Sequence, residues 1–344
     1  MRLLLLILGL IASHHIYGQY SFGFLPEFFF GRQSNARAES LGMGYASVDK
    51  DLGGVYFNPA STASLKGLSI IYSNTPPEYY STKGFYSFMA ISYKLNKKNQ
   101  ISISQFKFDY GKTQIVNVTE KPIIKKTNIN FSSEINKNFL IGLSTNFFFW
   151  RPGNSSSSKT IFFDLGIIRK NIILNSLNFG ISISNFNHSS TSTTFQNVYE
   201  KFNLPVISRF ALSYSHKFGG KLSKDTSVSP LEFFIQTEYQ KIINSEFRSS
   251  IKFGCEMKIF NLFSLRGGWY KEKISDFGLP LINKNTLSSI TYGLGFNLPL
   301  KKIIHFPFNI QVDYVSLPQV SYLKQLETLP NFKTIDVKLS SFIF

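Results

Sequence analysis

Hydrophobic and polar residues alternate along most of the chain from about residue 67 onward. In the segment 248–259, apolar residues take every second position from Ile251 to Ile259, and Lys252, Glu256 and Lys258 stand between them. A period of two residues predicts a β-strand with one apolar face and one polar face. Fourteen segments follow this pattern, with bounds near 67–73, 83–95, 99–110, 126–136, 138–151, 159–170, 175–186, 206–217, 230–240, 246–259, 262–272, 286–298, 306–317 and 333–344.

The lengths of these segments and of their connections indicate a membrane barrel. A tilted strand crosses a bilayer with roughly 9 to 11 residues. Short connections such as 96–98 alternate with long ones such as 187–205, as in barrels with short periplasmic turns and longer outer loops. A soluble β-sandwich also alternates, but its strands are usually shorter. We therefore predict an all-β fold, a 14-stranded antiparallel transmembrane β-barrel over residues 67–344.

The two ends of the chain carry patterns typical of export and of barrel assembly. An apolar run from Leu3 to Ala12 follows one basic residue. This run is typical of a secretory signal peptide and is too short to span a bilayer as a helix. We expect residues 1–18 to be a cleaved signal. The last predicted strand finishes on Phe342 and Phe344, the feature that the barrel-assembly machinery reads, so the predicted location is the outer membrane.

Basic residues outnumber acidic residues by 37 to 20, which gives a formal net charge of +17. Such an excess suggests nucleic-acid binding only where the basic residues form a patch. Here they occur as scattered pairs at the ends of apolar segments, such as Lys97-Lys98 and Lys301-Lys302. Lipid headgroups and lipopolysaccharide phosphates meet a membrane barrel at that level. We expect contacts with outer-membrane lipids and lipopolysaccharide, and no nucleic acid.

Charged residues on two neighbouring predicted strands should face the inside of the barrel. A Lys that faced lipid near the middle of the membrane would cost roughly 2 to 4 kcal/mol. The inward set consists of Glu232, Glu238, Lys252, Glu256 and Lys258. These charges suit a conducting pore and a plugged lumen equally, but the segment that precedes the first strand favours a plugged lumen.

Residues 19–66 do not alternate. Their glycines, Gly42 and Gly44, permit backbone conformations that other residues avoid, and Pro59 restricts the following turn. The glycine pair is not a dinucleotide-binding fingerprint, because Ser47 stands where a third glycine is needed. A segment of this length and composition suits a plug folded inside a barrel. We therefore expect residues 19–66 to form a hatch.

The stretch ARAESLGMGYASVDKDLGGVYFNPASTASL, which begins at Ala36, resembles the N-terminal block of the FadL superfamily of outer-membrane barrels, and especially its PorV/PorQ branch. Later pieces match in order, with LFSLRGGWY at 262–270, YGLGF at 292–296 and IQVDYVSLP at 310–318. The resemblance implies a barrel of 14 strands with an N-terminal hatch. It also implies that the hatch turn contains Gly42, Gly44, Asn58, Pro59 and Ala60.

The resemblance leaves two functions open. In the PorV/PorQ branch the barrel serves type IX secretion by docking against the translocon or escorting cargo. We expect this function, with a secretion-system protein or its cargo as partner. In the uptake branch the hatch gates a path for hydrophobic molecules, which is the alternative. A surface adhesin is a third possibility, although the longest outer loop, 187–205, is rich in Ser and Thr.

Catalysis has little support in the sequence. The histidines that remain after the predicted signal, His188, His216 and His305, lie far apart along the chain. No His-Glu-x-x-His, Gly-x-Ser-x-Gly or Cys-x-x-Cys motif is present to bind zinc or build a nucleophile. We expect a protein that is not an enzyme and has no catalytic residue, metal site or cofactor.

The third predicted strand contains one irregularity. Its apolar residues take odd positions up to Ile103 and even positions from Phe106 onward. A one-residue slip turns later side chains to the other face unless a bulge absorbs it. The resemblance makes this the strand that kinks to form a side portal in the uptake branch, so Ser104 and Gln105 mark a predicted lateral opening. An ordinary bulge without an opening is the alternative.

Overall fold

The computed structural model describes residues 29–30, 35–76, 85–109, 111, 113–115, 118–120, 122–151, 157–186, 191–195, 198–202, 204–219, 229–243, 249–273, 286–300, 307–318 and 331–341. Fourteen of its strands form one barrel: β1 (Leu68–Thr75), β2 (Phe85–Lys94), β3 (Asn99–Asp109), β6 (Ile123–Asn136), β7 (Phe139–Arg151), β8 (Ser158–Arg169), β9 (Leu177–Phe186), β12 (Ile207–Phe218), β13 (Leu231–Ile242), β14 (Ser249–Ile259), β15 (Phe263–Lys273), β16 (Thr286–Leu298), β17 (Phe308–Leu317) and β18 (Phe332–Ser341). Each pairs antiparallel with its neighbours, and β1 closes the barrel against β18.

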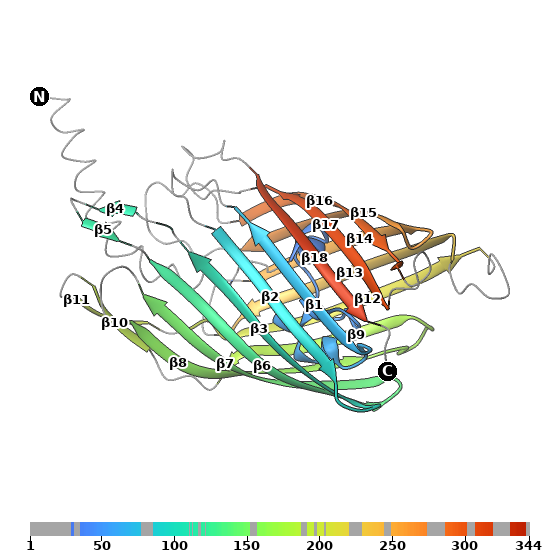
Figure 1. Ribbon diagram of the computed structural model, residues 1–344, viewed down its shortest axis with the longest axis horizontal. Coiled ribbons are helices and arrows are strands. Elements are labelled where there is room, and N and C mark those ends of the chain that lie inside the picture. The colour runs from blue at the N-terminus through green and yellow to red at the C-terminus, as the bar shows by residue number, and fades with distance from the viewer. Residues whose placement is uncertain are drawn as a thin grey trace, which may run out of the picture.

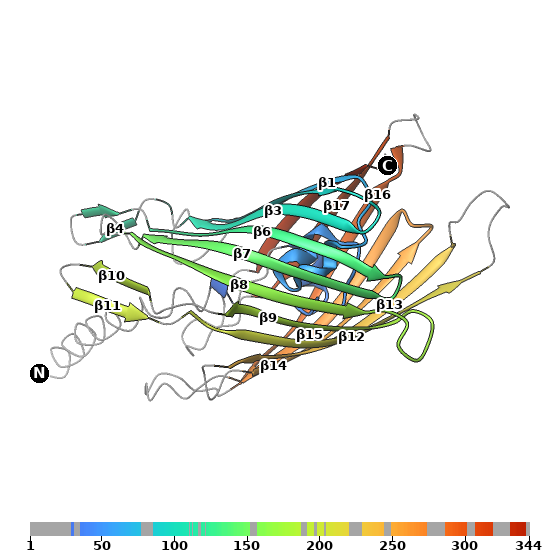
Figure 2. The same cartoon turned by 90° about the horizontal axis from the view of Figure 1, so that it is seen from below.

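Two short hairpins extend from one end of the barrel. β4 (Thr113–Ile115) pairs with β5 (Val118–Glu120), and β10 (Thr191–Phe195) pairs with β11 (Val198–Phe202). Both hairpins lie at the left of Figures 1 and 2. They share this end because β3 and β9, which precede them, run in the same direction. We call it the hairpin end, and we call the opposite end, with connections at 95–98, 137–138 and 260–262, the short-turn end.

The predicted fold class is confirmed, because the fourteen barrel strands coincide with the alternating segments to within a few residues. Alternate side chains point outward and inward. Many outward-facing side chains are apolar and exposed, among them Ile70, Tyr72, Met89, Ile91, Ile101, Ile103, Leu165, Ile167, Ile251 and Phe253. An apolar exterior is what contact with lipid requires, since lipid chains offer no hydrogen bonds to polar side chains.

Among the described residues, no helix has both the length and the apolar character needed to cross a membrane.

Residues 35–66, which we call the plug, lie inside the barrel and form the blue segment enclosed by strands in Figures 1 and 2. The plug contains the α-helix α2 (Ala36–Ser40) and the 3-10 helices η1 (Leu52–Tyr56) and η2 (Pro59–Thr62). Each helix begins at a side chain that accepts a backbone hydrogen bond, and these capping residues are Asn35, Asp51 and Asn58. Caps are important here because such short helices leave most of their N–H groups without an internal partner.

The main buried hydrophobic cluster joins the plug to the barrel wall. The plug contributes Leu41, Leu52 and Phe57, and the wall contributes Phe106 and Phe148, together with other apolar side chains. These side chains pack as a protein core does, with few voids. The described part of the lumen is therefore filled by the plug and by inward-facing side chains.

Strand β3 contains no slip at Ser104 and Gln105. It pairs with β2 and with β6 along its whole length without a register shift, and the alternation of buried and more exposed residues continues through this point. The predicted bulge and lateral opening are therefore wrong. The apolar parity changes because the inward side chains change character. Ser102 and Ser104 face a polar part of the lumen, and Phe106 faces an aromatic one.

Register shifts occur elsewhere in the wall. One lies between Glu134 and Asn136 in the pairing of β6 with β7, and the other lies between Phe163 and Leu165 in the pairing of β8 with β9. Opposite the second shift, Asn185 has a φ of 63°, and its N–H donates to Oδ1 of Asp164 at 2.7 Å.

Several predicted features lie outside the described residues. They are the signal peptide at 1–18, parts of the hatch at 19–28 and 31–34, and the terminal residues Phe342 and Phe344.

Candidate functional site

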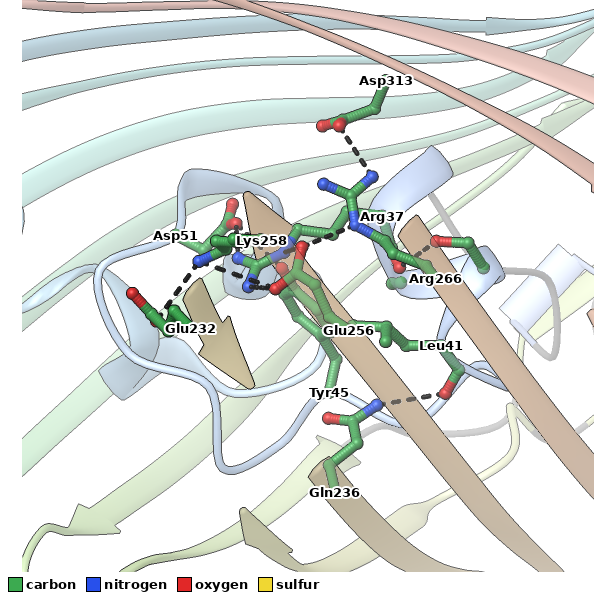
Figure 3. Close-up of polar contacts among 12 residues, drawn as sticks. Arg37, Leu41, Tyr45, Asp51, Glu232, Gln236, Glu256, Lys258, Arg266 and Asp313 are labelled. Atoms are coloured by element: carbon green, nitrogen blue, oxygen red, sulfur yellow. Dashed lines mark hydrogen bonds and ion pairs between the residues drawn. The ribbon is translucent and has the colours of Figure 1, made fainter. Parts of the chain in front are cut away.

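An ion-pair network centred on Arg37 ties the plug to the barrel (Figure 3). The Arg37 guanidinium contacts both carboxylate oxygens of Glu256 on β14, with Nε to Oε1 at 3.2 Å and Nη2 to Oε2 at 2.7 Å. Its Nη1 lies 2.8 Å from Oδ2 of Asp51, the cap of η1. A two-point contact between guanidinium and carboxylate fixes orientation as well as charge. Arg37 therefore connects α2, η1 and the wall.

Cations on two other strands extend the network. Arg266 on β15 donates its Nε to Oε1 of Glu256 at 2.6 Å and its Nη1 to Oδ1 of Asp313 on β17 at 2.7 Å. Lys338 on β18 places its Nζ 3.0 Å from Oδ1 of Asp51. The plug is thus bound to strands that lie in the last third of the chain.

The network joins charges of both signs. Lys258 lies 3.6 Å from Oε2 of Glu256 and 3.6 Å from Oε1 of Glu232. Its members are Arg37, Lys258, Arg266 and Lys338 with Asp51, Glu232, Glu256 and Asp313. The exposed Lys217 also lies 3.9 Å from Oε2 of Glu232, at the edge of the network. Removing one partner from a buried ion pair typically costs about 3–5 kcal/mol, because the other charge is left unpaired.

The Asp51 carboxylate is held in its charged form. Burial by itself would raise the pKa of Asp51, but Lys338 and Arg37 and a hydrogen bond from the Tyr45 hydroxyl at 2.8 Å outweigh burial and hold that pKa well below its usual range. Because the pKa of Asp51 is lower in the seated plug than in the unfolded chain, its carboxylate stabilises the seated plug at pH values above about 4. This contribution is lost as the pH falls further.

A second attachment uses backbone N–H groups of the plug. Oε2 of Glu238 on β13 accepts hydrogen bonds from the N–H of Tyr45 at 2.8 Å and of Ala46 at 2.9 Å. Lys252 on β14 lies 3.1 Å from the other oxygen of Glu238. The carboxylate is buried, so it needs both the cation and the amide donors to compensate for lost hydration.

The two hatch glycines lie beside this attachment. Gly42 has a φ of 69°, and a Cβ on it would overlap backbone atoms of Phe253 and Trp269. Gln236 on β13 donates to the carbonyl oxygen of Gly44. Both positions therefore bring the plug backbone against the wall, and Gly42 also needs the left-handed conformation that glycine tolerates.

The Asn58-Pro59-Ala60 sequence starts η2 and also binds the wall. Nδ2 of Asn58 donates to the carbonyl oxygens of Ile167 on β8 at 3.1 Å and of Ile181 on β9 at 3.2 Å. Its Oδ1 accepts from the N–H of Ala60 at 3.0 Å, and Pro59 occupies the first turn of η2. Asn58 thus caps a helix and links two strands to the plug.

Six wall glycines lie where an added Cβ would overlap the plug, and we call them the glycine seat. They occupy two groups of three adjacent strands. The set is Gly142 on β7, Gly166 on β8, Gly180 on β9, Gly254 on β14, Gly268 on β15 and Gly293 on β16. Because the wall has no side chain at these positions, the plug rests directly on it. The plug backbone makes the contact at four of the glycines, and the side chains of Asn58 and Ser40 make it at Gly166 and Gly293.

An aromatic cluster lies between the plug and the hairpin end of the barrel. Phe29 stacks on Phe106 with ring centroids 4.6 Å apart, and Phe30 lies 5.4 Å from Phe148. Phe162 lies 5.9 Å from Phe30. Contacts of this kind bury large apolar areas and stabilise a fixed arrangement of rings. The cluster closes the lumen on this side.

A buried lysine lies beside the aromatic cluster, close to the ring of Tyr56 in the plug. Nζ of Lys126 on β6 is 3.0 Å from Oδ2 of Asp164 on β8 and 5.2 Å from the ring centroid of Tyr56. A cavity of about 10 Å³ lies beside it, lined by Tyr56, Ser104, Phe106, Lys126 and Asn128. This volume has room for about one water molecule.

The predicted inward charges all appear in these contacts. Glu238, Lys252 and Glu256 are buried against the plug, and Glu232 and Lys258 are partly exposed. The partners missed from the sequence are Arg37, Asp51, Arg266, Asp313 and Lys338. The last three have the inward parity of their strands, so the same alternation rule identifies them. No pattern in the non-alternating plug distinguishes Arg37 or Asp51 from other charged residues.

No group of three or more His, Cys, Asp and Glu side chains suited to hold a metal ion occurs in the part of the chain that the structure describes.

Comparisons with known proteins find solved structures of similar fold but no matching family model or curated protein. No family model matches the chain, and no curated protein matches it. A mutant of the monoaromatic hydrocarbon channel TodX is similar, with a TM-score of 0.55 and 12% identity over 90% of this chain and 99% of that chain. The Ralstonia pickettii toluene transporter TbuX gives a TM-score of 0.51 and 10% identity, covering 90% of this chain and 99% of that chain. A Pseudomonas aeruginosa FadL homologue gives a TM-score of 0.53 and 11% identity, covering 91% of this chain and 99% of that chain.

The likeness to these structures, at such low identity, is one of fold. The chain has the closed antiparallel barrel of FadL-type channels. Neither the family models nor these structures point to the PorV/PorQ branch that the sequence resembles.

Proposed function

We propose that this protein is an outer-membrane transport barrel, not an enzyme, and that it admits small hydrophobic molecules past its plug. The observation that supports this best is a plug anchored by charges inside a barrel whose exterior is apolar. The proteins that share the fold include a monoaromatic hydrocarbon channel and a toluene transporter.

Apolar side chains occupy the lumen between the hairpin end and the plug. A solute that enters from the hairpin end meets the aromatic rings of the buried cluster, among them Trp150, Phe108 and Phe106. Below them, the cavity beside Lys126 holds about 10 Å³, far less than the roughly 300 Å³ or more of a small-molecule site. Passage of a hydrocarbon therefore requires the plug or the aromatic cluster to move.

A cross-link between plug and wall tests this requirement. A Cβ on Gly44 would lie 3.3 Å from the Cβ of Lys252, close to the roughly 3.5–4.5 Å that a disulfide prefers. We expect Gly44→Cys with Lys252→Cys, in a Cys255→Ser background, to form a disulfide on oxidation. Uptake of labelled toluene by cells that carry the oxidised variant should fall to the level of cells without the protein, and reduction should restore it.

The two single-cysteine variants are the matched controls, because they carry the same substitutions but cannot form the cross-link. Oxidation should leave their uptake unchanged. Equal toluene uptake by cells with and without the protein would rule out the transport proposal. Full uptake with the plug cross-linked would show instead that hydrocarbons pass without movement of this part of the plug.

A role in type IX protein secretion is the second candidate, and one observation favours it. The connection between β8 and β9 exposes three consecutive apolar side chains, Ile172, Ile173 and Leu174, with Ile173 84% exposed. An exposed apolar tip at the end of a barrel is a feature of protein-docking sites. Purification from native outer membranes should recover a secretion-system partner with the wild type and lose it with Ile173→Asp.

The proposal also includes the route to the membrane. We infer that residues 1–18 are removed as a signal, that the barrel-assembly machinery reads Phe342 and Phe344, and that lipids and lipopolysaccharide surround the barrel. The protein should fractionate with outer membranes and migrate faster unheated than boiled. Deletion of the last three residues should prevent insertion, and normal insertion of that truncation would contradict this part of the proposal.

A further inference from the structure

The outer face of the barrel carries charge of almost one sign, and nearly all of it lies at one end. By the alternation of each strand, ten charged side chains of the described barrel strands point outward, and nine of them are cations. The anion is Asp109, and the cation at the short-turn end is Arg169. The other eight occupy the last three positions of their strands at the hairpin end, and we call them the basic collar: Lys107, Lys125, Arg151, Lys159, Lys241, Lys271, Lys273 and Lys333.

The collar contrasts with the inside of the barrel, where cations and anions pair with one another. An outward side chain contacts the membrane, and a lysine facing hydrocarbon costs far more near the middle of the membrane than near the interface. The collar therefore marks the level at which lipid chains give way to lipid headgroups. Because the described strands offer no matching set of outward anions, the headgroups have to supply the negative charge.

Three lysines of the collar form a row on one side of the barrel. Lys107 on β3 lies opposite Lys125 on β6. The next partner of Lys125 is Phe149 on β7, and Lys159 on β8 lies opposite Phe149. Neighbouring strands are about 4.8 Å apart, so three strand steps span roughly 14 Å. We call Lys107, Lys125 and Lys159 the lysine row.

The charge of the lysine row is only partly compensated. Nζ of Lys107 lies 2.9 Å from Oδ2 of Asp109. Lys125 lies 5.9 Å from the ring centroid of Phe149, and no carboxylate that the structure describes pairs with Lys125 or Lys159. Like charges directly opposite each other on neighbouring strands destabilise a sheet. An anion that bridges the row would remove this repulsion.

The outer surface next to the row, toward the middle of the barrel, is largely apolar. One outward position further along the strands, Phe147 on β7 lies opposite Ile161 on β8, and both are exposed. One position further again, Ile103 on β3 lies opposite Ile129 on β6, and both are exposed. A ligand that covers the row and this surface together needs an anionic headgroup and acyl chains.

The chemistry of the row identifies the headgroup. Lysine ammonium groups bind phosphate through charge-assisted hydrogen bonds. Three such groups spread over roughly 14 Å suit a headgroup with separated phosphates. Lipopolysaccharide carries phosphates at both ends of its acylated disaccharide, whereas an ordinary phospholipid carries one phosphate. Lipopolysaccharide therefore matches the row better than a phospholipid does.

We propose that the lysine row binds the phosphates of one lipopolysaccharide molecule in the outer leaflet, with acyl chains lying over Phe147, Ile161 and the neighbouring isoleucines. The inference rests on the outer-membrane location proposed above, and it assigns the hairpin end to the cell surface. The bound lipid covers the outer side of β3, β6, β7 and β8. The inner side of the same strands carries Phe106, Phe148 and Phe162 of the buried cluster.

Replacing the lysines of the row tests the proposal. The row variant combines Lys107→Gln, Lys125→Gln and Lys159→Gln. The matched control removes the same charge at the short-turn end, where three exposed lysines lie in turns, and it combines Lys97→Gln, Lys98→Gln and Lys137→Gln. The full chain, purified from membranes and stripped of lipid in detergent, is titrated with lipid A, the phosphorylated anchor of lipopolysaccharide. Native mass spectrometry counts the lipid A bound to each barrel.

We expect the row variant to bind lipid A about tenfold or more weakly than the wild type, because each lysine near an anionic headgroup contributes to binding. The control should stay within about twofold of the wild type, since its lysines lie outside the row. A third variant with arginine at the three row positions keeps the charge and should retain binding. Faster migration of the unheated protein confirms that each variant is folded. Equal affinities of the row variant and the control would overturn the proposal.

A competing lipid distinguishes lipopolysaccharide from other anionic lipids. Phosphatidylglycerol carries one phosphate, so the wild type should bind it about tenfold or more weakly than lipid A. Equal affinity for the two lipids would assign the row to single-phosphate headgroups and overturn the assignment to lipopolysaccharide. Binding in detergent requires neither hydrocarbon uptake nor a particular membrane. Failure of toluene uptake or of outer-membrane fractionation is therefore distinguishable from failure of lipid A binding.

Discussion

The plug meets two walls of different construction. Along β7 to β9 and β14 to β16, glycines let the plug touch the barrel directly, and Glu256 and Asn58 bind it through several hydrogen bonds. Along β1 to β3, serines and Gln100 face the plug with unpaired polar atoms. The difference indicates that the first wall contributes most of the polar attachment of the plug, while the second contributes less, with Lys94 on β2 donating to the carbonyl oxygen of Ala63.

The largest expected effect comes from removing the central cation of the attachment to the first wall. Arg37→Met leaves Glu256 and Asp51 buried without their shared partner and should destabilise the seated plug by about 3–5 kcal/mol. Hydrogen exchange of peptides from residues 35–66, read by mass spectrometry, measures this. Lys258→Met is the control, since Lys258 is partly exposed and such pairs contribute about 0–1 kcal/mol. Equal effects of the two substitutions would contradict the assignment of Arg37 as the centre of the network.

The glycine seat predicts a contrast between adjacent residues. A Cβ on Gly268 would overlap the backbone of Gly42, whereas a Cβ on Gly267 would meet only the Sγ of Cys255 at 3.8 Å. Gly268→Ala should therefore cost about 1–3 kcal/mol through overpacking, and Gly267→Ala should stay within about 0.5 kcal/mol. Thermal loss of the fast-migrating unheated band compares the two. Similar values would show that the plug shifts freely to accommodate a methyl group.

Acid should loosen the plug. The pKa of Asp51 lies below its usual range because Lys338, Arg37 and Tyr45 outweigh burial. The sign follows from linkage: the unfolded carboxyl binds protons first, so stability is present above about pH 4 and falls as the pH drops below that value. Exchange of η1 amides, corrected for the intrinsic rate, should increase on acidification. Asp51→Asn should remove this pH dependence, and its persistence in that variant would assign the effect to another carboxyl.

The smallest effect is expected at Ser92 on β2, on the wall formed by β1 to β3. Ser92→Ala removes a hydroxyl that has no protein partner, so the change in stability should be under about 0.5 kcal/mol. Ser182→Ala removes a hydroxyl that donates to Phe57 at 2.6 Å and should cost about 1–3 kcal/mol, because a buried carbonyl oxygen loses a partner. Denaturant titration of both variants checks the difference. A larger cost for Ser92→Ala would mean that Ser92 also holds the plug.

The barrel could be predicted from the sequence because one rule governs it. A strand between lipid and a polar interior must alternate, and this local pattern fixed the strands and the inward parity of Glu238, Lys252 and Glu256. The rule failed at Ser104 and Gln105, where a change in what the inward side chains contact looked like a slip of the backbone. Inward residues need not be polar when an aromatic cluster fills the lumen, as at Phe106.

The plug contacts could not be predicted in the same way. Asn58 and Gly42 were noticed as turn-forming residues, but their roles depend on carbonyls and backbone atoms of strands more than 100 positions away. Arg37 and Asp51 hold the plug through partners on β14 and β18, and no local pattern in the sequence indicates such distant pairing. The sequence therefore predicted a plug, while the contacts that hold it came from the structure.

One contact has a consequence for how the chain is assembled. The N–H of Ala36 donates to Oδ2 of Asp336 at 2.6 Å across 300 positions of sequence, and the neighbouring Lys338 binds Asp51. The part synthesised early therefore has some of its partners on a strand synthesised much later. Until β18 joins the sheet, the N–H of Ala36 and the Asp51 carboxylate lack these two partners. Closure of the barrel between β1 and β18 and the final seating of the plug are thus expected to be one event in biogenesis.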